Sequence, residues 1–292
     1  MKPAWFDYYA PCSLDDALRM LGEAGGDGRV LAGGQSLMPM LNLRILRPAV
    51  VVDINRIEEL SRLEITPDSL TIGATVRHAE LLRNQIVREG WPLLAEATAQ
   101  VAHMAIRNRG TVCGSVSHND PSAEHPSVLV TLGGTVLIAS AKGRRELPAE
   151  DFFTGMLSNA LEPGEMVVGL RYPRQPAGTA TAFVEFTRRL GDFAIAGAAA
   201  RLVIHDGVCA SARLTLVGMG QGPFRAKAAE NLLAGRSLGD KDFADAAASV
   251  VEAVDPAEDV HASAAYRRHL AGVMANRALH GAFARTKGQP IG

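Results

Sequence analysis

Two short glycine-bearing segments constrain this chain more than any other feature of its sequence. The first is Ala32-Gly33-Gly34-Gln35-Ser36, and the second is Arg109-Gly110-Thr111-Val112-Cys113-Gly114-Ser115. Because glycine lacks a Cβ and adopts positive φ, successive backbone N–H groups of such a segment can converge on an anion. Either segment alone is more simply a tight turn. Two of them on one chain indicate a cleft for a long ligand with two phosphates.

Other common sites of phosphate, hydrolytic or metal chemistry are not supported. No Gly-Lys-Ser/Thr follows the first segment, and neither the GxGxxG pattern of doubly wound dinucleotide folds nor a GxSxG nucleophile elbow occurs. A metal site is not predicted either. The candidate ligands are irregularly spaced and lie on an expected Pro-containing loop; they are His118, Asp120, Glu124 and His125.

Composition narrows the class of protein further. The 292 residues are 47% hydrophobic, enough for two ordinary domains with a sizeable core. The net charge of −1 argues against a broad nucleic-acid surface. With no apolar run of roughly 18 residues and no N-terminal signal core, we expect no transmembrane segment and a cytoplasmic location. Cys12, Cys113 and Cys209 are too few and too scattered for an iron–sulfur cluster or a structural zinc site.

The first half of the chain alternates short apolar runs with turns. Strands are predicted at 29–31, at 49–54 (fully buried), and in a hairpin of 63–65 with 70–73. Helices are predicted at 78–83, from Pro92, and at 127–132, before a strand at 135–140. Two prolines and a glycine at 171–179 indicate a boundary, which we place between domains at 1–176 and 177–292.

The second half predicts an antiparallel three-stranded sheet backed by helices. Its strands are expected at 181–187, 195–204 and 210–217, joined by Leu190-Gly191-Asp192 and His205-Asp206-Gly207. Three helices follow, at about 225–235, 240–254 and 263–286. The last residues, 287–292, are expected to form a frayed tail.

Taken jointly, these segments resemble one protein family. Residues 32–44 are similar to the first flavin motif of the FAD-binding medium subunits of molybdenum hydroxylases, and residues 106–115 and 120–126 to the second motif and its continuation. That family includes the medium subunit of aerobic carbon monoxide dehydrogenase and the flavin domain of xanthine dehydrogenase. Residues 151–153, 161–165 and 188–194 also fit the family pattern, so the resemblance covers essentially the whole chain.

The resemblance implies a mixed α/β (α+β) fold, with an FAD-binding domain of two α/β subdomains and a smaller C-terminal domain. The two glycine segments would hold the pyrophosphate, Glu124 would contact hydroxyls of FAD, and Phe193 would lie near the isoalloxazine ring. No catalytic or metal-binding residue is predicted in this chain. The cofactor-binding residues implied are Ala32, Gly33, Gly34, Gln35, Ser36, Leu37, Ala102, Thr111, Gly114, Ser115, His118, Glu124, Asp192 and Phe193.

Two residues depart from the family pattern. Gln35 stands where some relatives have histidine; it still donates a hydrogen bond but does not titrate. Cys113 stands where the second motif usually has glycine, so we expect a less free backbone there and a thiol near the flavin. The chain also lacks the cysteine-rich loop that binds an iron–sulfur cluster in some relatives.

The function implied is that of an electron-transfer flavoprotein subunit. A large subunit would carry the molybdenum cofactor and oxidise the substrate, a small subunit with 2Fe–2S clusters would pass electrons to the FAD, and an external acceptor would receive them. A dimer of heterotrimers is expected. Two alternatives stay open, a self-contained FAD-dependent oxidase and a non-catalytic nucleotide-binding module. The substrate (carbon monoxide, an aldehyde, a purine or another N-heteroaromatic) and the acceptor are left open.

Overall fold

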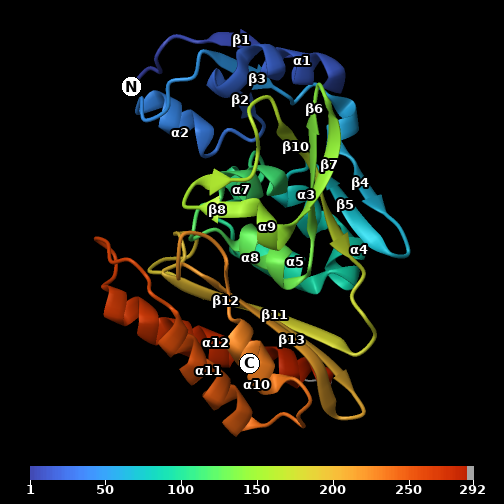
Figure 1. Cartoon of the computed structure of the whole chain (residues 1–292), viewed down its shortest axis with the longest axis vertical. Coiled ribbons are helices and arrows are strands. Elements are labelled where there is room, and N and C mark those ends of the chain that lie inside the picture. The colour runs from blue at the N-terminus through green and yellow to red at the C-terminus, as the bar shows by residue number, and fades with distance from the viewer. Residues whose placement is uncertain (288–292) are drawn as a thin grey trace.

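The computed structural model describes residues 1–287, so the tail expected at 287–292 lies, apart from Lys287, outside the described residues. Three α/β units are stacked along the long axis of the molecule (Figure 1). The N-terminal unit is a parallel sheet in the order β1-β3-β2. Its elements are β1 (Asp7–Tyr9), α1 (Leu14–Ala24), η1 (Gly25–Asp27), β2 (Gly28–Leu31), α2 (Leu37–Asn42) and β3 (Val50–Asp53).

The middle unit is an antiparallel five-stranded sheet in the order β4-β5-β10-β6-β7, with helices beside it. Strand β10 crosses back from far along the chain to the centre of this sheet, where Leu170 and Tyr172 are fully buried. The elements are η2 (Glu58–Ser61), β4 (Leu63–Ile65), β5 (Ser69–Gly73), α3 (His78–Arg83), α4 (Gln85–Gly90), α5 (Pro92–Gln100), α6 (Met104–Arg107), α7 (Val112–His118), α8 (Glu124–Thr131), β6 (Thr135–Ser140), β7 (Gly143–Pro148), α9 (Ala149–Phe152), β8 (Phe153–Gly155), β9 (Ser158–Asn159) and β10 (Met166–Pro173).

The C-terminal unit is an antiparallel sheet in the order β11-β12-β13-β14. Asp206 and Gly207 both have positive φ, 50° and 78°, which suits the two-residue hairpin between β12 and β13. The elements are β11 (Thr179–Phe186), β12 (Ala196–His205), β13 (Val208–Val217), β14 (Phe224–Arg225), α10 (Lys227–Leu233), α11 (Asp240–Ala253) and α12 (Ala264–Thr286).

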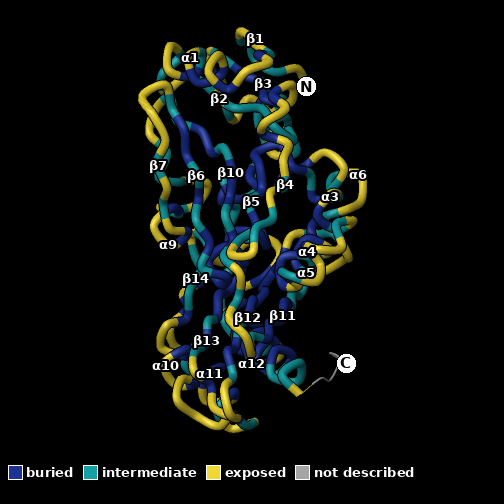
Figure 2. Tube along the Cα trace, turned by 90° about the vertical axis from the view of Figure 1, so that its right-hand side faces the viewer, coloured by how far each residue is buried: buried dark blue, intermediate teal, exposed yellow. Residues whose placement is uncertain are grey.

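The sheet β11–β13 is covered on both faces (Figure 2). Its small residues, such as Ala198 and Ala200, pack in one core with α10–α12. The opposite face contributes Phe183, Ala199 and Val217 to the core of the N-terminal and middle units. The C-terminal sheet therefore packs with one face against the middle unit and with the other against helices α10–α12.

The fold confirms the predicted mixed α/β class, the two α/β units and the smaller helix-backed C-terminal sheet. A fourth strand, β14, was not predicted because it has only two residues, Phe224 and Arg225. In β3 only Val51 and Val52 are buried, so the expectation of a fully buried strand was wrong at its ends. The sequence interpretation also placed no element at β7 or β10.

Candidate functional site: two facing glycine segments

The first glycine segment is the turn between β2 and α2. Gly34 has φ of 72°, and the Gln35 side-chain amide donates to the Gly33 carbonyl at 3.1 Å, which fixes the turn. Among residues 1–287, no acceptor receives a hydrogen bond from the backbone N–H groups of residues 33–37. Successive unpaired donors of this kind form a concave cradle for an anion.

The second glycine segment lies directly against the first. A Cβ on Gly33 would come within 2.6 Å of the Arg109 carbonyl oxygen and 2.7 Å of the Gly110 Cα. Ordinary carbon–oxygen contacts are longer, so only glycine allows this approach of two backbones. The structure thus brings together the two segments that the sequence singled out.

Two side chains that the sequence interpretation missed connect these segments. The Asn55 side-chain amide donates to the Ala32 carbonyl at 2.9 Å, and Asn55 in turn accepts from the Arg77 guanidinium. The same guanidinium donates to the Arg109 carbonyl. Only their places next to secondary-structure elements could have pointed to these two residues, since Asn55 follows β3 closely and Arg77 immediately precedes α3.

The second segment continues into helix α7 and is not a loop. Thr111 is the N-cap residue, and its hydroxyl accepts from the Gly114 N–H at 3.0 Å. Gly114, Ser115 and His118 lie on the half-exposed face of α7, whereas Val112 and Val116 are buried. A helix therefore presents the predicted residues of this segment on one side.

Cys113 corrects an expectation. It lies within α7 with an ordinary helical backbone, is 2% exposed, and its Sγ lies 3.5 Å from the carbonyls of Ile72 and Gly73 in β5. Burial raises the pKa of the Cys113 thiol, which stays protonated. The thiol thus faces the core of the middle unit and away from Gly114 and Ser115. Glycine is not required here, because α7 needs no positive φ at this residue.

Glu124 is the first residue of α8, not part of a loop, and is 7% exposed. Burial, together with the nearby Glu185 carboxylate, raises the pKa of Glu124 to about 8. His118 ends α7, and burial lowers the pKa of its imidazole against the opposing effect of Asp120. The left-handed residue Asn119 (φ 48°) turns the chain between the two helices.

The remaining predicted residues come from two loops that touch. Ala102 has φ of 41°, and its carbonyl accepts from the Arg107 guanidinium at 2.8 Å. A Cβ on Gly191 would lie 2.3 Å from the His103 ring, so the turn with Asp192 and Phe193 packs on the loop that follows α5. Phe193 is 70% exposed and available to cover a planar ring.

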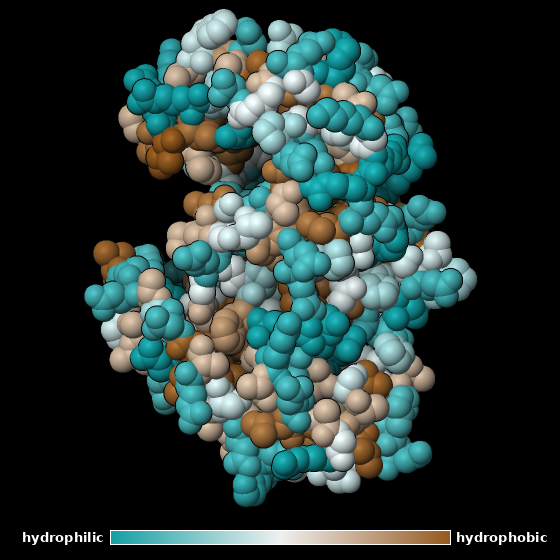
Figure 3. Space-filling model, viewed as in Figure 1, coloured by the Kyte–Doolittle hydropathy of each residue, from teal (hydrophilic) through white to brown (hydrophobic). Residues whose placement is uncertain are grey.

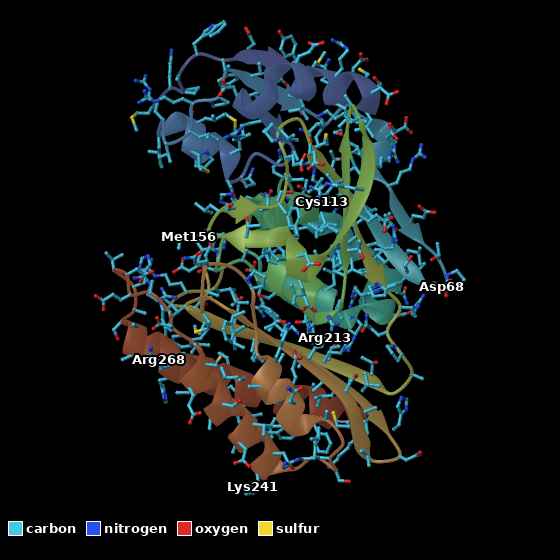
Figure 4. The ribbon with its side chains drawn as sticks, viewed as in Figure 1. Asp68, Cys113, Met156, Arg213, Lys241 and Arg268 are labelled. Atoms are coloured by element: carbon cyan, nitrogen blue, oxygen red, sulfur yellow. The ribbon has the colours of Figure 1, made fainter. Side chains whose placement is uncertain are left out.

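The first glycine segment and Arg109 line a hollow on one side of the molecule, and the other predicted residues do not line it. A cavity of about 300 Å³ is lined by both glycine segments, through Gly33, Gly34, Gln35 and Arg109. Figure 3 shows a deep indentation between the N-terminal unit and the part below it. Met156, in the β8–β9 hairpin, is exposed at the open side of the molecule, whereas Cys113 lies inside (Figure 4).

Comparison with known proteins assigns the family. Residues 4–175 match the model of the FAD binding domain in molybdopterin dehydrogenase, and residues 181–282 match that of the CO dehydrogenase flavoprotein C-terminal domain. The chain belongs to the FAD-binding family of the molybdopterin dehydrogenases. It is 41% identical to the 6-hydroxypseudooxynicotine dehydrogenase complex subunit alpha of Paenarthrobacter nicotinovorans, over 98% of this chain and 97% of that protein.

Solved structures agree with this family assignment. The carbon monoxide dehydrogenase of Hydrogenophaga pseudoflava that lacks the Mo-pyranopterin moiety of its molybdenum cofactor matches with a TM-score of 0.95 and 37% identity, over 98% of this chain and 99% of that one. Quinoline 2-oxidoreductase from Pseudomonas putida 86 matches with a TM-score of 0.92 and 36% identity, over 99% of both chains. The chain is thus an oxidoreductase flavoprotein with an FAD-binding domain, and its relatives include a dehydrogenase complex subunit and carbon monoxide dehydrogenases that carry a molybdenum cofactor.

The residues present fit FAD. The unpaired N–H groups of residues 33–37 and the hydroxyls of Thr111 and Ser115 suit a pyrophosphate, and Glu124 suits hydroxyl groups. Residues 1–287 contain no cluster of three or more His, Cys, Asp or Glu side chains arranged to hold a metal. In the same range, no helix is long and apolar enough to cross a membrane.

Proposed function

We propose that this chain is the FAD-carrying medium subunit of a molybdenum-containing hydroxylase or dehydrogenase, and that it passes electrons from an iron–sulfur subunit to an external acceptor. The observation that carries the proposal is the direct contact of the two glycine segments, at Gly33 and Gly110, in a chain that matches carbon monoxide dehydrogenase medium chains over nearly its whole length.

The protein's own part in this function is binding, orientation and exclusion of water. Bound FAD supplies the electron transfer, which no side chain of this chain performs. Residues 33–37 would hold the pyrophosphate through their unpaired N–H groups, and Thr111 and Ser115 through their hydroxyls, while Gly114 has no Cβ to hinder a close approach. Glu124 and His118 would contact the hydroxyl-bearing part of the cofactor, and Ala102, Asp192 and Phe193 would cover the ring.

The organisation of the complex is part of the proposal. The domains span 1–176 and 177–292, a division supported by the Pro- and Gly-containing connection between β10 and β11. A large subunit with molybdenum cofactor and a small 2Fe–2S subunit are the partners, arranged as a dimer of heterotrimers. The cytoplasmic location stays a prediction.

Co-expression with both partner subunits tests the proposal. We expect one FAD per chain, no substrate oxidation by the isolated chain, and flavin reduction in the complex when substrate is added. Because relatives at 41% identity include a caffeine dehydrogenase subunit, N-heteroaromatic compounds come first in the screen, before aldehydes and carbon monoxide. Turnover by the single chain would support a self-contained oxidase instead, and a colourless chain would contradict any flavoprotein function.

A further inference from the structure

The turn between β11 and β12, at 187–193, carries Phe193 and contacts the middle unit. Among the described residues, no backbone–backbone hydrogen bond joins this turn to the middle unit. Leu190 and Phe193 are 82% and 70% exposed, so burial of large side chains does not hold the turn either. The position of its tip therefore depends on packing at Gly191, which is half-buried.

Gly191 is the point of contact with the middle unit. It has φ of 87°, and a Cβ there would lie 2.3 Å from Cε1 and 2.5 Å from Nδ1 of His103. Both atoms belong to the imidazole ring, so the ring packs where any other residue would carry its side chain. Only glycine allows both this backbone conformation and this close approach.

Arg107 fixes the loop from which His103 extends. Its guanidinium Nη1 donates to the carbonyl oxygens of Val101 and Ala102, at 2.7 and 2.8 Å. Ala102 has φ of 41°, in the left-handed region that alanine rarely adopts. Such a conformation persists only where the surroundings hold it, and it is common beside ligands. The charged donor of Arg107 is the interaction that holds it here.

Helix α6 connects Arg107 to His103 directly. His103 is the N-cap residue of α6, and Arg107 is the last residue of this single helical turn. The Arg107 backbone N–H donates to the His103 carbonyl at 3.0 Å. The loop 101–103 is therefore held at both ends by one residue, through its backbone and through its guanidinium.

We propose that Arg107 and His103 are positioning residues of the FAD site, which hold the turn at 187–193 so that Phe193 covers the isoalloxazine ring. Arg107 acts through the carbonyls of the loop 101–103, and His103 acts through its packing on Gly191. Because the turn is held before the cofactor arrives, less ordering remains to be done when FAD binds. The inference rests on the proposed function, since the flavin ring is what Phe193 would cover.

Two glycines of the same sheet give a matched pair of variants. Gly191→Ala adds a methyl group against the His103 ring, whereas Gly207→Ala, in the β12–β13 hairpin, adds one where no atom lies within 4 Å. Both glycines have positive φ, 87° and 78°, so the backbone strain is similar and only the contact differs. We expect Gly191→Ala to raise the FAD dissociation constant by about twofold to tenfold, the loss of one aromatic contact, and Gly207→Ala to leave it unchanged.

The visible circular dichroism of bound FAD reports the surroundings of the ring, which a role in stability alone would not alter. This spectrum should change in Gly191→Ala and stay as in wild type in Gly207→Ala. The same FAD affinity and the same spectrum in both variants would overturn the inference.

A double variant tests the contact itself. His103→Ala removes the ring and makes room for the new methyl group. The FAD dissociation constant of His103→Ala/Gly191→Ala should therefore equal that of His103→Ala alone. Two effects that multiply in the double variant would show that His103 and Gly191 act independently, against the inference.

Hydrogen exchange in the apo chains separates this inference from the proposed function. In Arg107→Met the loop 101–103 loses its charged donor, so the amides of 187–193 should exchange faster than in wild type. Arg107→Lys, which keeps a charged donor, should restore part of the protection, and Arg88→Met, at an exposed position, should exchange as wild type does. If no chain binds FAD, the proposed function fails, and exchange alone decides whether the turn is held. Equal exchange in wild type and Arg107→Met would contradict the inference even where FAD binds normally.

Discussion

Replacing Gly33 with alanine tests the contact between the two glycine segments. The new methyl group would lie 2.6 Å from the Arg109 carbonyl oxygen, 2.7 Å from the Gly110 Cα and 3.1 Å from the Thr111 backbone nitrogen. All three atoms belong to the backbone, so no side chain can swing aside. The clash is relieved only if the segments move apart, which displaces Thr111 and the start of α7.

The size of the effect follows from overpacking at one site. An extra methyl group in a closely packed contact costs about 1–3 kcal/mol. Because the segments are partly exposed and held together mainly through Asn55 and Arg77, we expect them to separate without global unfolding. The cost then falls on FAD binding, and the dissociation constant rises by about fivefold to above a hundredfold.

Titration of FAD into apo chains, followed by quenching of flavin fluorescence, measures this change. Gly26→Ala is the matched control, because a Cβ there has no atom within 4 Å. Urea unfolding of the apo chains separates lost affinity from lost stability. An unchanged FAD dissociation constant in Gly33→Ala would refute the reasoning that these two backbones form one binding cleft.

Three further predictions concern the surroundings of the site. Arg77→Met removes a charged donor to the Arg109 carbonyl and should weaken FAD binding by about 1.5–3 kcal/mol in calorimetry. The control Arg83→Met, at an exposed position, should leave FAD affinity unchanged. Equal FAD affinities of the two variants would contradict a role of the Arg77 hydrogen bond in the site. Asn119→Ala loses the bonds that tie the β8–β9 hairpin and should lower the free energy of unfolding in urea by about 1–3 kcal/mol, a prediction that an unchanged midpoint would disprove. Burial lowers the pKa of His78 to about 4, so between about pH 6.5 and pH 4 the imidazole is protonated in the unfolded chain and neutral in the folded chain. The free energy of unfolding should therefore decrease by about 3 kcal/mol as the pH falls through that window. Urea unfolding should show a shallower acid decrease for His78→Gln, and equal slopes would exclude this origin.

Local patterns predicted much of the fold from the sequence. The helix at His78–Arg83 has the predicted bounds, and the strands around Asp206-Gly207 follow from turn chemistry that needs no distant contact. Strand β10 was missed because its place at the centre of a sheet depends on pairing with β5 and β6, which are distant in sequence. A short apolar run does not by itself report such pairing.

In the candidate site, too, features set by the local sequence were predicted, whereas features that depend on distant contacts were missed. Gly33 and Gly34 were found because glycine is needed where backbones approach closely. Asn55 and Arg77 were missed because their roles depend on carbonyls at Ala32 and Arg109, far away along the chain. The expectation for Cys113 was wrong because it rested on the residue's position in the motif, which does not show that Cys113 lies in a helix with its side chain toward the core.

The FAD content of the chain tests the central claim most directly. The full chain, expressed with excess flavin and its partner subunits, should show a flavin absorbance spectrum with one FAD per chain, and Gly33→Ala prepared in parallel should show less. A wild-type chain that stays colourless and gives no saturable FAD titration would contradict the claim that the two glycine segments form a flavin site.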